Sequence, residues 1–265
     1  MLYDIDYFIV CHDQEIILKQ ISDGTFNSLC NYRFLFVGNK PVDKLDKNDS
    51  QIIICRDLDD NIEEYPCLCS FTAWYAVVKN QICKANYIVL LEYDTLIKSN
   101  LHTNNIQNNE VITYSRTLLD HYVFYKSTPW LEISLKEVYD IDLATFIQTH
   151  KNLYKYWPTT TNVALSRDIL DRFVDWFLPM TDIFKDYSLG SYVHERAFFV
   201  FCVLNNIKIT FQDSTLYHHQ LRSHQTNDIY GQFLETKNTI IFHSSMIPEY
   251  DRLYSFHFEQ CLKNK

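Results

Sequence analysis

Glycine is scarce in this chain, and its scarcity excludes two common ways of holding a phosphate group. The 265 residues include only four glycines, Gly24, Gly38, Gly190 and Gly231. The glycine-rich loops of dinucleotide-binding and P-loop proteins need two or three glycines at close spacing. Neither loop can form here, so a ligand that carries a diphosphate needs another counter-charge, such as a cation held by acidic side chains.

Basic runs and long apolar segments are missing as well. The chain has 24 Lys and Arg against 33 Asp and Glu, a net charge of −9, and no basic stripe that could follow a phosphate backbone. We therefore expect no nucleic-acid partner. No stretch approaches the roughly 18 apolar residues of a transmembrane helix, and Asp4 and Asp6 lie where a signal peptide carries basic residues. These features predict a cytoplasmic protein with no transmembrane segment.

The cysteines show neither a metal-binding nor a disulfide pattern. There is no CxxC pair, and most of the eight lie within apolar runs. We interpret them as buried free thiols in a reducing compartment rather than as zinc ligands or disulfides. They are Cys11, Cys30, Cys55, Cys67, Cys69, Cys83, Cys202 and Cys261.

Apolar runs and helical patterns alternate along the chain, and hydrophobic residues make up 47% of it, enough for a packed core. The alternation predicts an α/β fold in one domain, whose central sheet is mixed, mostly parallel and flanked by helices. We expect strands over 7–12, 32–38, 51–56, 87–91, 111–114, 161–165 and 207–211. We expect helices over 15–21, 66–80, 167–178 and 192–205, the third capped by Ser166 and ended by Pro179.

The strand expected at residues 87–91 ends at two acidic residues, Glu92 and Asp94. Side chains two apart on an extended chain point to the same side, so both carboxylates can face one ligand. Open α/β sheets bind their ligands at the carboxyl ends of their strands. A divalent cation that is held by one or two carboxylates and by substrate phosphates fits this pattern. An ordinary polar strand end is the alternative interpretation.

The order of elements and the acid-x-acid motif resemble the GT-A-fold glycosyltransferases, whose Asp-x-Asp motif binds a metal and a nucleotide-sugar diphosphate. Three segments are also similar to bacterial capsular-polysaccharide glycosyltransferase-like proteins. Residues 60–62 and 69–80 resemble their "DNI" and "CELTALYWIWKN" stretches, and residues 190–196 resemble "GYLSERL". The chain departs from that family at Ser70, where the family has an acidic residue, and at residues 91–94, where it has "HYRR". The second departure brings the chain closer to the GT-A motif.

The resemblance implies an enzyme of polysaccharide biosynthesis that moves a sugar from a nucleotide-sugar donor, expected to be UDP-linked, to a glycan or glycoconjugate hydroxyl. Its cofactor would be Mn²⁺ or Mg²⁺. Residues 1–265 would form a single domain, with a nucleotide-binding part over about 1–110 and an acceptor-binding part over about 111–265. The donor sugar, the choice between inversion and retention, and the oligomeric state stay open.

Several residues have expected roles in such a reaction. Asp94 would ligate the cation directly, while Glu92 would bind it through water or contact the ribose. Glu195 is the candidate general base of an inverting transfer; the alternative is a carboxylate favoured by a helix N-terminus and paired with Arg196 or Arg167.

Later histidines are candidates for a further metal ligand, as the resemblance implies. His218 and His219 follow the last expected strand, and His243 is a second option; surface histidines in a loop are the alternative. Arg222 is a candidate phosphate contact. Trp130 and Trp157 could stack on a sugar or pack in the core.

Nucleotide recognition is expected where the first and third strands end. His12 closes the first strand, and Arg56, Asp57 and Asp59 follow the third. A carboxylate at this position can accept hydrogen bonds from ribose hydroxyls or from a base edge. Solvated loop acids are the alternative for each aspartate.

Two other kinds of function fit the same residues. A nucleotidyltransferase or metal hydrolase could use the same strand-end acids, although nucleotidyltransferases of this shape usually carry an early glycine-rich loop. A catalytically silent scaffold or glycan-binding protein is the other alternative.

Overall fold

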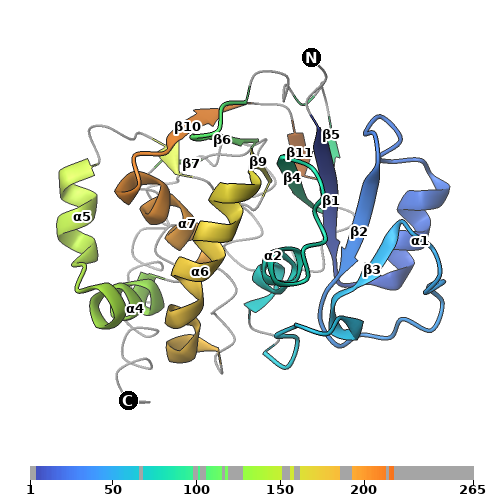
Figure 1. Cartoon of the computed structure of the whole chain (residues 1–265), viewed down its shortest axis with the longest axis horizontal. Helices are drawn as coiled ribbons and strands as arrows, with labels where there is room; N and C mark the ends of the chain where they lie inside the picture. Colours follow the sequence, from blue (N-terminus) through green and yellow to red (C-terminus); the bar gives the residue numbers. More distant parts are fainter. Residues whose placement is uncertain are drawn as a thin grey trace, which may run out of the picture.

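The central sheet of the computed structural model has seven strands in the order β10-β6-β9-β4-β1-β2-β3 (Figure 1). Neighbouring strands are parallel from β3 through β2 and β1 to β4, and also between β6 and β10, whereas β9 is antiparallel to β4 and β6. The expected mixed, mostly parallel sheet is confirmed. The structure describes residues 4–65, 68–97, 101, 106–114, 117–118, 128–150, 156–157, 162–185, 193–212 and 215–217.

All of the expected strands and helices are present, with ends that differ by a few residues. The first half of the chain contains β1 (Ile5–Cys11), α1 (Gln14–Ser22), β2 (Tyr32–Phe36), β3 (Ile52–Ile54), the 3-10 helix η1 (Cys55–Asp57), α2 (Ser70–Lys79), β4 (Tyr87–Glu92), β5 (Thr95–Ile97), β6 (Glu110–Thr113) and β7 (Thr117–Leu118). The second half contains α4 (Thr128–Tyr139), α5 (Leu143–His150), β8 (Tyr156–Trp157), β9 (Val163–Ser166), α6 (Arg167–Phe184), α7 (Val193–Leu204), β10 (Lys208–Phe211) and β11 (Thr215–Tyr217).

Side chains of the central strands enter two separate cores, one on each face of the sheet. Phe8 and Val10 of β1 belong to the larger core, which also contains buried residues of α2, α4, α6 and α7. Ile9 and Cys11 belong to the smaller core, which contains Ile17 of α1. This alternation follows from the two-residue period of a strand, and it explains why β1 reads as one continuous apolar run.

Helix α6 continues past Pro179, so the prediction that this proline ends the helix was wrong. The predicted cap is confirmed, because the Ser166 hydroxyl accepts a hydrogen bond from the main-chain N–H of Ile169 at 3.3 Å. An interior proline costs a helix about 3 kcal/mol. Beyond it, Met180 and Phe184 are fully buried, and burial of each such side chain contributes about 1.5–3 kcal/mol, which offsets the penalty.

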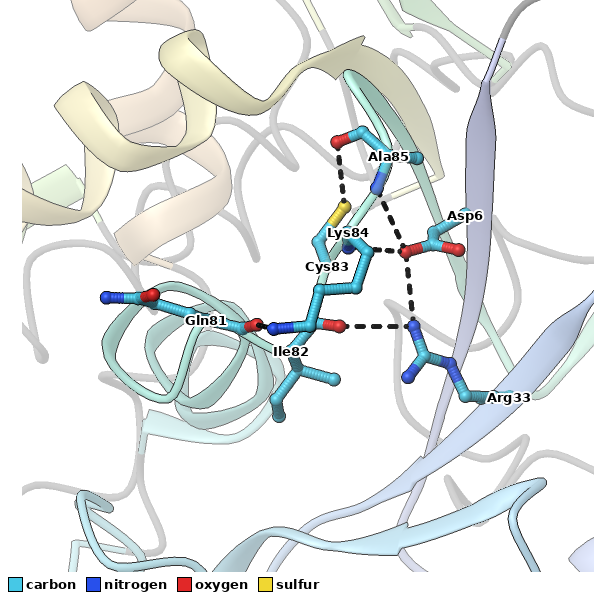
Figure 2. Close-up of polar contacts among 7 residues, drawn as sticks. All are labelled: Asp6, Arg33, Gln81, Ile82, Cys83, Lys84 and Ala85. Carbon is cyan, nitrogen blue, oxygen red and sulfur yellow. Dashed lines mark hydrogen bonds and ion pairs between the residues drawn. The ribbon is translucent and has the colours of Figure 1, made fainter.

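A polar cluster holds the amino ends of β1 and β2 against the loop that leads into β4 (Figure 2). The Asp6 carboxylate accepts hydrogen bonds from Arg33 Nη2 at 3.2 Å and from the main-chain N–H groups of Lys84 at 2.9 Å and Ala85 at 3.4 Å. Arg33 also donates to the carbonyl of Ile82 at 3.3 Å. These contacts hold β1, β2 and the start of β4 together at the end of the sheet opposite to Glu92.

The described cysteines agree in part with the expected buried thiols. Six cysteines are free in the part of the chain that the structure describes; four of these are buried, while Cys30 and Cys69 are exposed. Burial raises the pKa of Cys11 to about 12 and that of Cys83 to about 12. No helix within the described ranges has the length and apolar character needed to cross a bilayer.

Candidate functional site

A cavity of about 210 Å³ opens where the direction of the sheet connections reverses. β2 and β3 follow β1 on one side, and β4 lies on its other side, so the carboxyl ends of β1 and β4 flank a topological switch point, where open α/β sheets bind ligands. The cavity is lined by Val10, Cys11, His12, Val37, Gly38, Asn39, Lys40, Glu63, Cys69, Ser70, Thr72 and Glu92.

Glu92 is the last residue of β4, and it lines this cavity. The Ser70 hydroxyl, at the N-terminus of α2, donates a hydrogen bond to Glu92 Oε1 at 2.7 Å. The main-chain N–H of Glu92 donates to Asn162 Oδ1, also at 2.7 Å. Both the side chain and the backbone of Glu92 are therefore fixed by residues far away in the sequence.

Asp94 lies two residues further on, in the turn between β4 and β5, and is only 7% exposed. The residue between the two acids is also held in place. Tyr93 accepts a hydrogen bond at its carbonyl from Gln20 Nε2 at 2.5 Å, and its ring makes an edge-to-face contact with His12 at 5.0 Å. The acid-x-acid segment is thus an ordered turn with few exposed atoms.

Glu195 occupies the first turn of α7 and forms an ion pair with Arg196 at 2.6 Å. Burial raises the pKa of Glu195 to about 8; the Arg196 charge opposes this rise, while the negative charges of Glu92 and Asp94 add to it. The charges of Arg196, Glu92 and Asp94 therefore all act on the Glu195 carboxyl. The Arg196 pairing that the sequence offered as an alternative role for Glu195 is present as well.

The predicted nucleotide residues are distributed unevenly around the cavity. His12 lines it directly. Arg56 instead donates from Nη1 to the carbonyls of Gly38 at 3.3 Å and Lys40 at 2.9 Å, and so holds the loop that forms one wall. Gly38 has a φ of 83°, a conformation that favours glycine.

The two predicted aspartates lie in the exposed segment after β3. Asp57 forms an ion pair with Lys47 at 2.5 Å, and Asp59 is exposed to solvent. Neither residue lines the cavity. Their contact with a nucleotide stays a prediction.

Several predicted site residues lie outside the described residues: His218, His219, Arg222 and His243. Their roles stay predictions. Trp130 is 6% exposed and packs in the larger core, which is the alternative that the sequence left open for it. For Trp157 the structure describes only the backbone, in β8.

Sequence reasoning missed Glu63 and Lys40, which also line the cavity. Glu63 is 9% exposed, accepts a hydrogen bond from the N–H of Gly38, and has its pKa raised by burial. Lys40 forms an ion pair with Asp13 at 3.0 Å. Both residues lie in irregular segments. Glu63 directly follows residues 60–62, but the resemblance of that stretch gives it no role.

The chemistry of the site suits a hard cation, because carboxylate oxygens are the ligands that Mg²⁺ and Mn²⁺ prefer. Glu92 and Asp94 are the residues placed to provide them. Within the described ranges, no group of three or more His, Cys, Asp or Glu side chains is arranged to hold a metal. The two carboxylates would hold a cation here together with oxygen atoms of the substrate.

Comparisons with known proteins establish the fold. No protein-family model matches the sequence, and no curated protein is significantly similar to it. Among solved structures, the apo form of the bifunctional glycosyltransferase WbbM matches 81% of this chain with 11% identity and a TM-score of 0.52. The match spans 45% of WbbM, so this chain corresponds to less than half of that protein. The result confirms a GT-A-like fold.

A second solved structure is similar along almost its whole length. The galactosyltransferase LgtC, in complex with donor and acceptor sugar analogues, matches 94% of this chain and 95% of its own, with 10% identity and a TM-score of 0.38.

Proposed function

We propose that this protein is a glycosyltransferase that transfers a sugar from a nucleotide-sugar donor to a hydroxyl of a glycan or glycoconjugate. The observation that carries the proposal is that Glu92 lines a cavity at the switch point of a GT-A-like sheet, with Asp94 two residues further along the chain. The pKa of Glu195, raised chiefly by burial, also responds to the charges of these two acids. Glycosyl transfer needs both a cation site for the leaving diphosphate and a base for the acceptor, and these residues supply candidates for each.

Glu92 and Asp94 would hold Mn²⁺ or Mg²⁺, with phosphate oxygens of the donor completing its shell. Such a cation stabilises the negative charge that develops on the departing nucleoside diphosphate. The fit rests on the hard oxygen donors of Glu92 and Asp94 and on their negative charges, which add to the rise in the pKa of Glu195 that burial causes. His218 and His219 remain candidates for a further ligand.

Glu195 would act as the general base of an inverting transfer. The acceptor oxygen attacks the anomeric carbon, its proton passes to the Glu195 carboxylate, and the bond from the anomeric carbon to the phosphate oxygen breaks with its electron pair on the diphosphate. A pKa of about 8 suits this role, because a base works best when its pKa lies near the working pH. Arg196 orients the carboxylate through their 2.6 Å contact.

The nucleoside of a donor, which we propose is UDP-linked, would occupy the cavity beside His12. Arg56 supports the wall of this cavity through the carbonyls of Gly38 and Lys40. With no glycine-rich loop in the sequence, the cation and basic groups such as Arg222 would neutralise the diphosphate. Asp57 and Asp59 would reach the ribose or base only from the rim.

Product analysis separates this function from its alternatives. The purified chain is incubated with UDP-, GDP-, dTDP- and CMP-linked sugars, with Mn²⁺ or with chelator, and the released compounds are identified. A glycosyltransferase releases nucleoside diphosphate from at least one diphosphate-linked donor, and only with the cation. Release of pyrophosphate from a nucleoside triphosphate and a sugar phosphate would indicate a nucleotidyltransferase. Nucleotide-sugar binding without any product would indicate a silent scaffold.

A further inference from the structure

Asn162 lies beside the acidic end of β4, although no sequence motif marks it. It directly precedes β9, and it is 2% exposed. β9 pairs antiparallel with β4, and the last pair of residues joins Leu90 to Val163. Asn162 therefore comes level with the residues that follow Leu90, which include both acids.

The amide of Asn162 contacts both ends of the four-residue segment that carries the acids. Its Oδ1 accepts a hydrogen bond from the main-chain N–H of Glu92 at 2.7 Å, and its Nδ2 donates to Thr95 Oγ1 at 2.8 Å. Thr95 is also buried, at 1% exposure. Asn162 is itself fixed, because its carbonyl accepts a hydrogen bond from the N–H of Tyr114 at 2.9 Å.

These contacts restrict the backbone on either side of Asp94. A large change in the backbone angles of residues 92–95 would break one of these two hydrogen bonds, which leaves a polar group of the site without its partner. Gln20 adds a third tie at the carbonyl of Tyr93. A ligand set that is already ordered loses less conformational entropy when it binds its cation.

We infer that Asn162 is a positioning residue of the acidic pair. It holds Glu92 and Asp94 in the arrangement that binds a divalent cation, and it acts through the backbone of Glu92 and the side chain of Thr95. The inference rests on the proposed function, in which this pair holds the cation. Residues that orient metal ligands in this way typically change metal affinity by about 10- to 100-fold when they are replaced.

Direct measurement of Mn²⁺ binding to the full chain tests this role without an activity assay. Calorimetry gives the affinity, and the electron paramagnetic resonance spectrum reports the symmetry of the bound ion. We expect Asn162→Ala to weaken binding by at least tenfold and to alter the spectrum. Thr95→Val, which removes one of the two contacts, should have a smaller effect. Asn162→Ser serves as the test if Asn162→Ala does not fold.

Ser166→Ala is the matched control. Ser166 ends the same strand, is buried, and loses the α6 cap and a 3.1 Å hydrogen bond to the carbonyl of Asn108 when it is replaced. It should lower the melting temperature and leave Mn²⁺ affinity unchanged. If folded Asn162 variants bind Mn²⁺ as tightly as the unsubstituted chain does, the inference about Asn162 is wrong, and the proposed function is unaffected. Absence of Mn²⁺ binding by the unsubstituted chain, measured both without and with UDP, would instead refute the cation site, and the inference with it.

Discussion

The Ser70 hydroxyl donates a hydrogen bond to the Glu92 carboxylate at 2.7 Å, across 22 residues of sequence. This contact joins the two positions at which the sequence departs from the capsular-polysaccharide family that it resembles. An acidic residue at position 70 would place a second negative charge beside Glu92, whereas a serine can donate to it. The two departures are therefore compatible with each other, and together they orient the Glu92 carboxylate at the cavity wall.

Removing this hydroxyl should weaken the site without unfolding the protein. In Ser70→Ala, the Glu92 carboxylate loses a hydrogen bond of a kind that contributes about 1.5–3 kcal/mol. We expect the Kd of nucleoside diphosphate in the presence of Mn²⁺ to rise roughly tenfold, measured by calorimetry. Ser70→Thr keeps the hydroxyl and is the control; an equal loss in both variants would assign the effect to packing at the N-terminus of α2.

Asp94 should be essential for cation-dependent binding. Asp94→Ala removes the carboxylate, and Asp94→Asn keeps its shape but not its charge, so we expect both variants to lose Mn²⁺-dependent nucleotide binding while circular dichroism shows an unchanged fold. Asp175→Asn is the control, because Asp175 is 66% exposed and forms its ion pair with Lys79 instead. Full Mn²⁺-dependent turnover in the Asp94 variants would rule out a role as ligand.

Replacing Glu195 by Gln should separate catalysis from binding. The amide retains the size of the side chain but cannot accept the proton, so turnover should fall by roughly 10²–10⁴-fold, with donor affinity little changed. Steady-state kinetics and calorimetry provide the two measurements. Unchanged turnover in a folded Glu195→Gln protein would leave Glu195 with only its structural pairing to Arg196.

Activity should rise with pH through the pKa of Glu195. This carboxyl has its pKa raised to about 8, chiefly by burial, so it is mostly protonated below pH 8 and becomes a competent base above it. A cation at Glu92 and Asp94 offsets the two charges that help to raise this pKa, so the midpoint of kcat/KM should fall as the Mn²⁺ concentration increases. A midpoint that does not respond to Mn²⁺ would contradict this coupling.

The stability of the fold should have the opposite pH dependence. The folded-state pKa of Glu195 is raised above its ordinary value of 4.5, chiefly by burial, so the folded state binds the proton more tightly than the unfolded state does. Its contribution to the free energy of unfolding is therefore largest below about pH 4.5 and is lost as the pH rises towards 8. Urea unfolding of the unsubstituted chain and of Glu195→Gln across this range measures the difference.

The hydrogen bonds that Asp6 accepts from Arg33, Lys84 and Ala85 should contribute to the stability of the fold and not to activity. In Asp6→Ala, Arg33 and two main-chain N–H groups lose their acceptor, and we expect unfolding to become easier by about 2–3 kcal/mol. Asp182→Ala breaks an exposed pair with Lys185 and should change stability by less than about 1 kcal/mol. Urea unfolding gives both values, and a fall in kcat of the folded Asp6 variant would contradict the separation.

The sequence predicted those parts of the site that depend on local patterns. The apolar run before Glu92 identifies a buried strand, and the two-residue spacing to Asp94 places the acids at its carboxyl end. Ser166 before a helical pattern identifies a cap. Each of these inferences needs only neighbouring residues, and the strand and the cap are confirmed by the structure.

Features that depend on tertiary pairing could not be predicted in the same way. The contacts of Ser70 and Asn162 with Glu92 join residues that are 22 and 70 positions apart, and only the register of the sheet brings them together. The end of α6 was mispredicted because the burial of Met180 and Phe184 outweighs the local effect of Pro179. Helices α4 and α5 were not predicted at all.

During synthesis of the chain, one edge of β4 stays unpaired until β9, its neighbour in the sheet, has been made. Strands β1 to β4 are complete once Glu92 has left the ribosome, but β4 has no partner on its outer edge until β9 follows, 70 residues later. Translation takes about 4–14 s to cover that distance. During this time the unpaired backbone groups along the edge of β4 can pair with a strand of another nascent chain. Slower translation of residues 93–163 would lengthen this exposure, and a chaperone that covers the edge of β4 would shorten it.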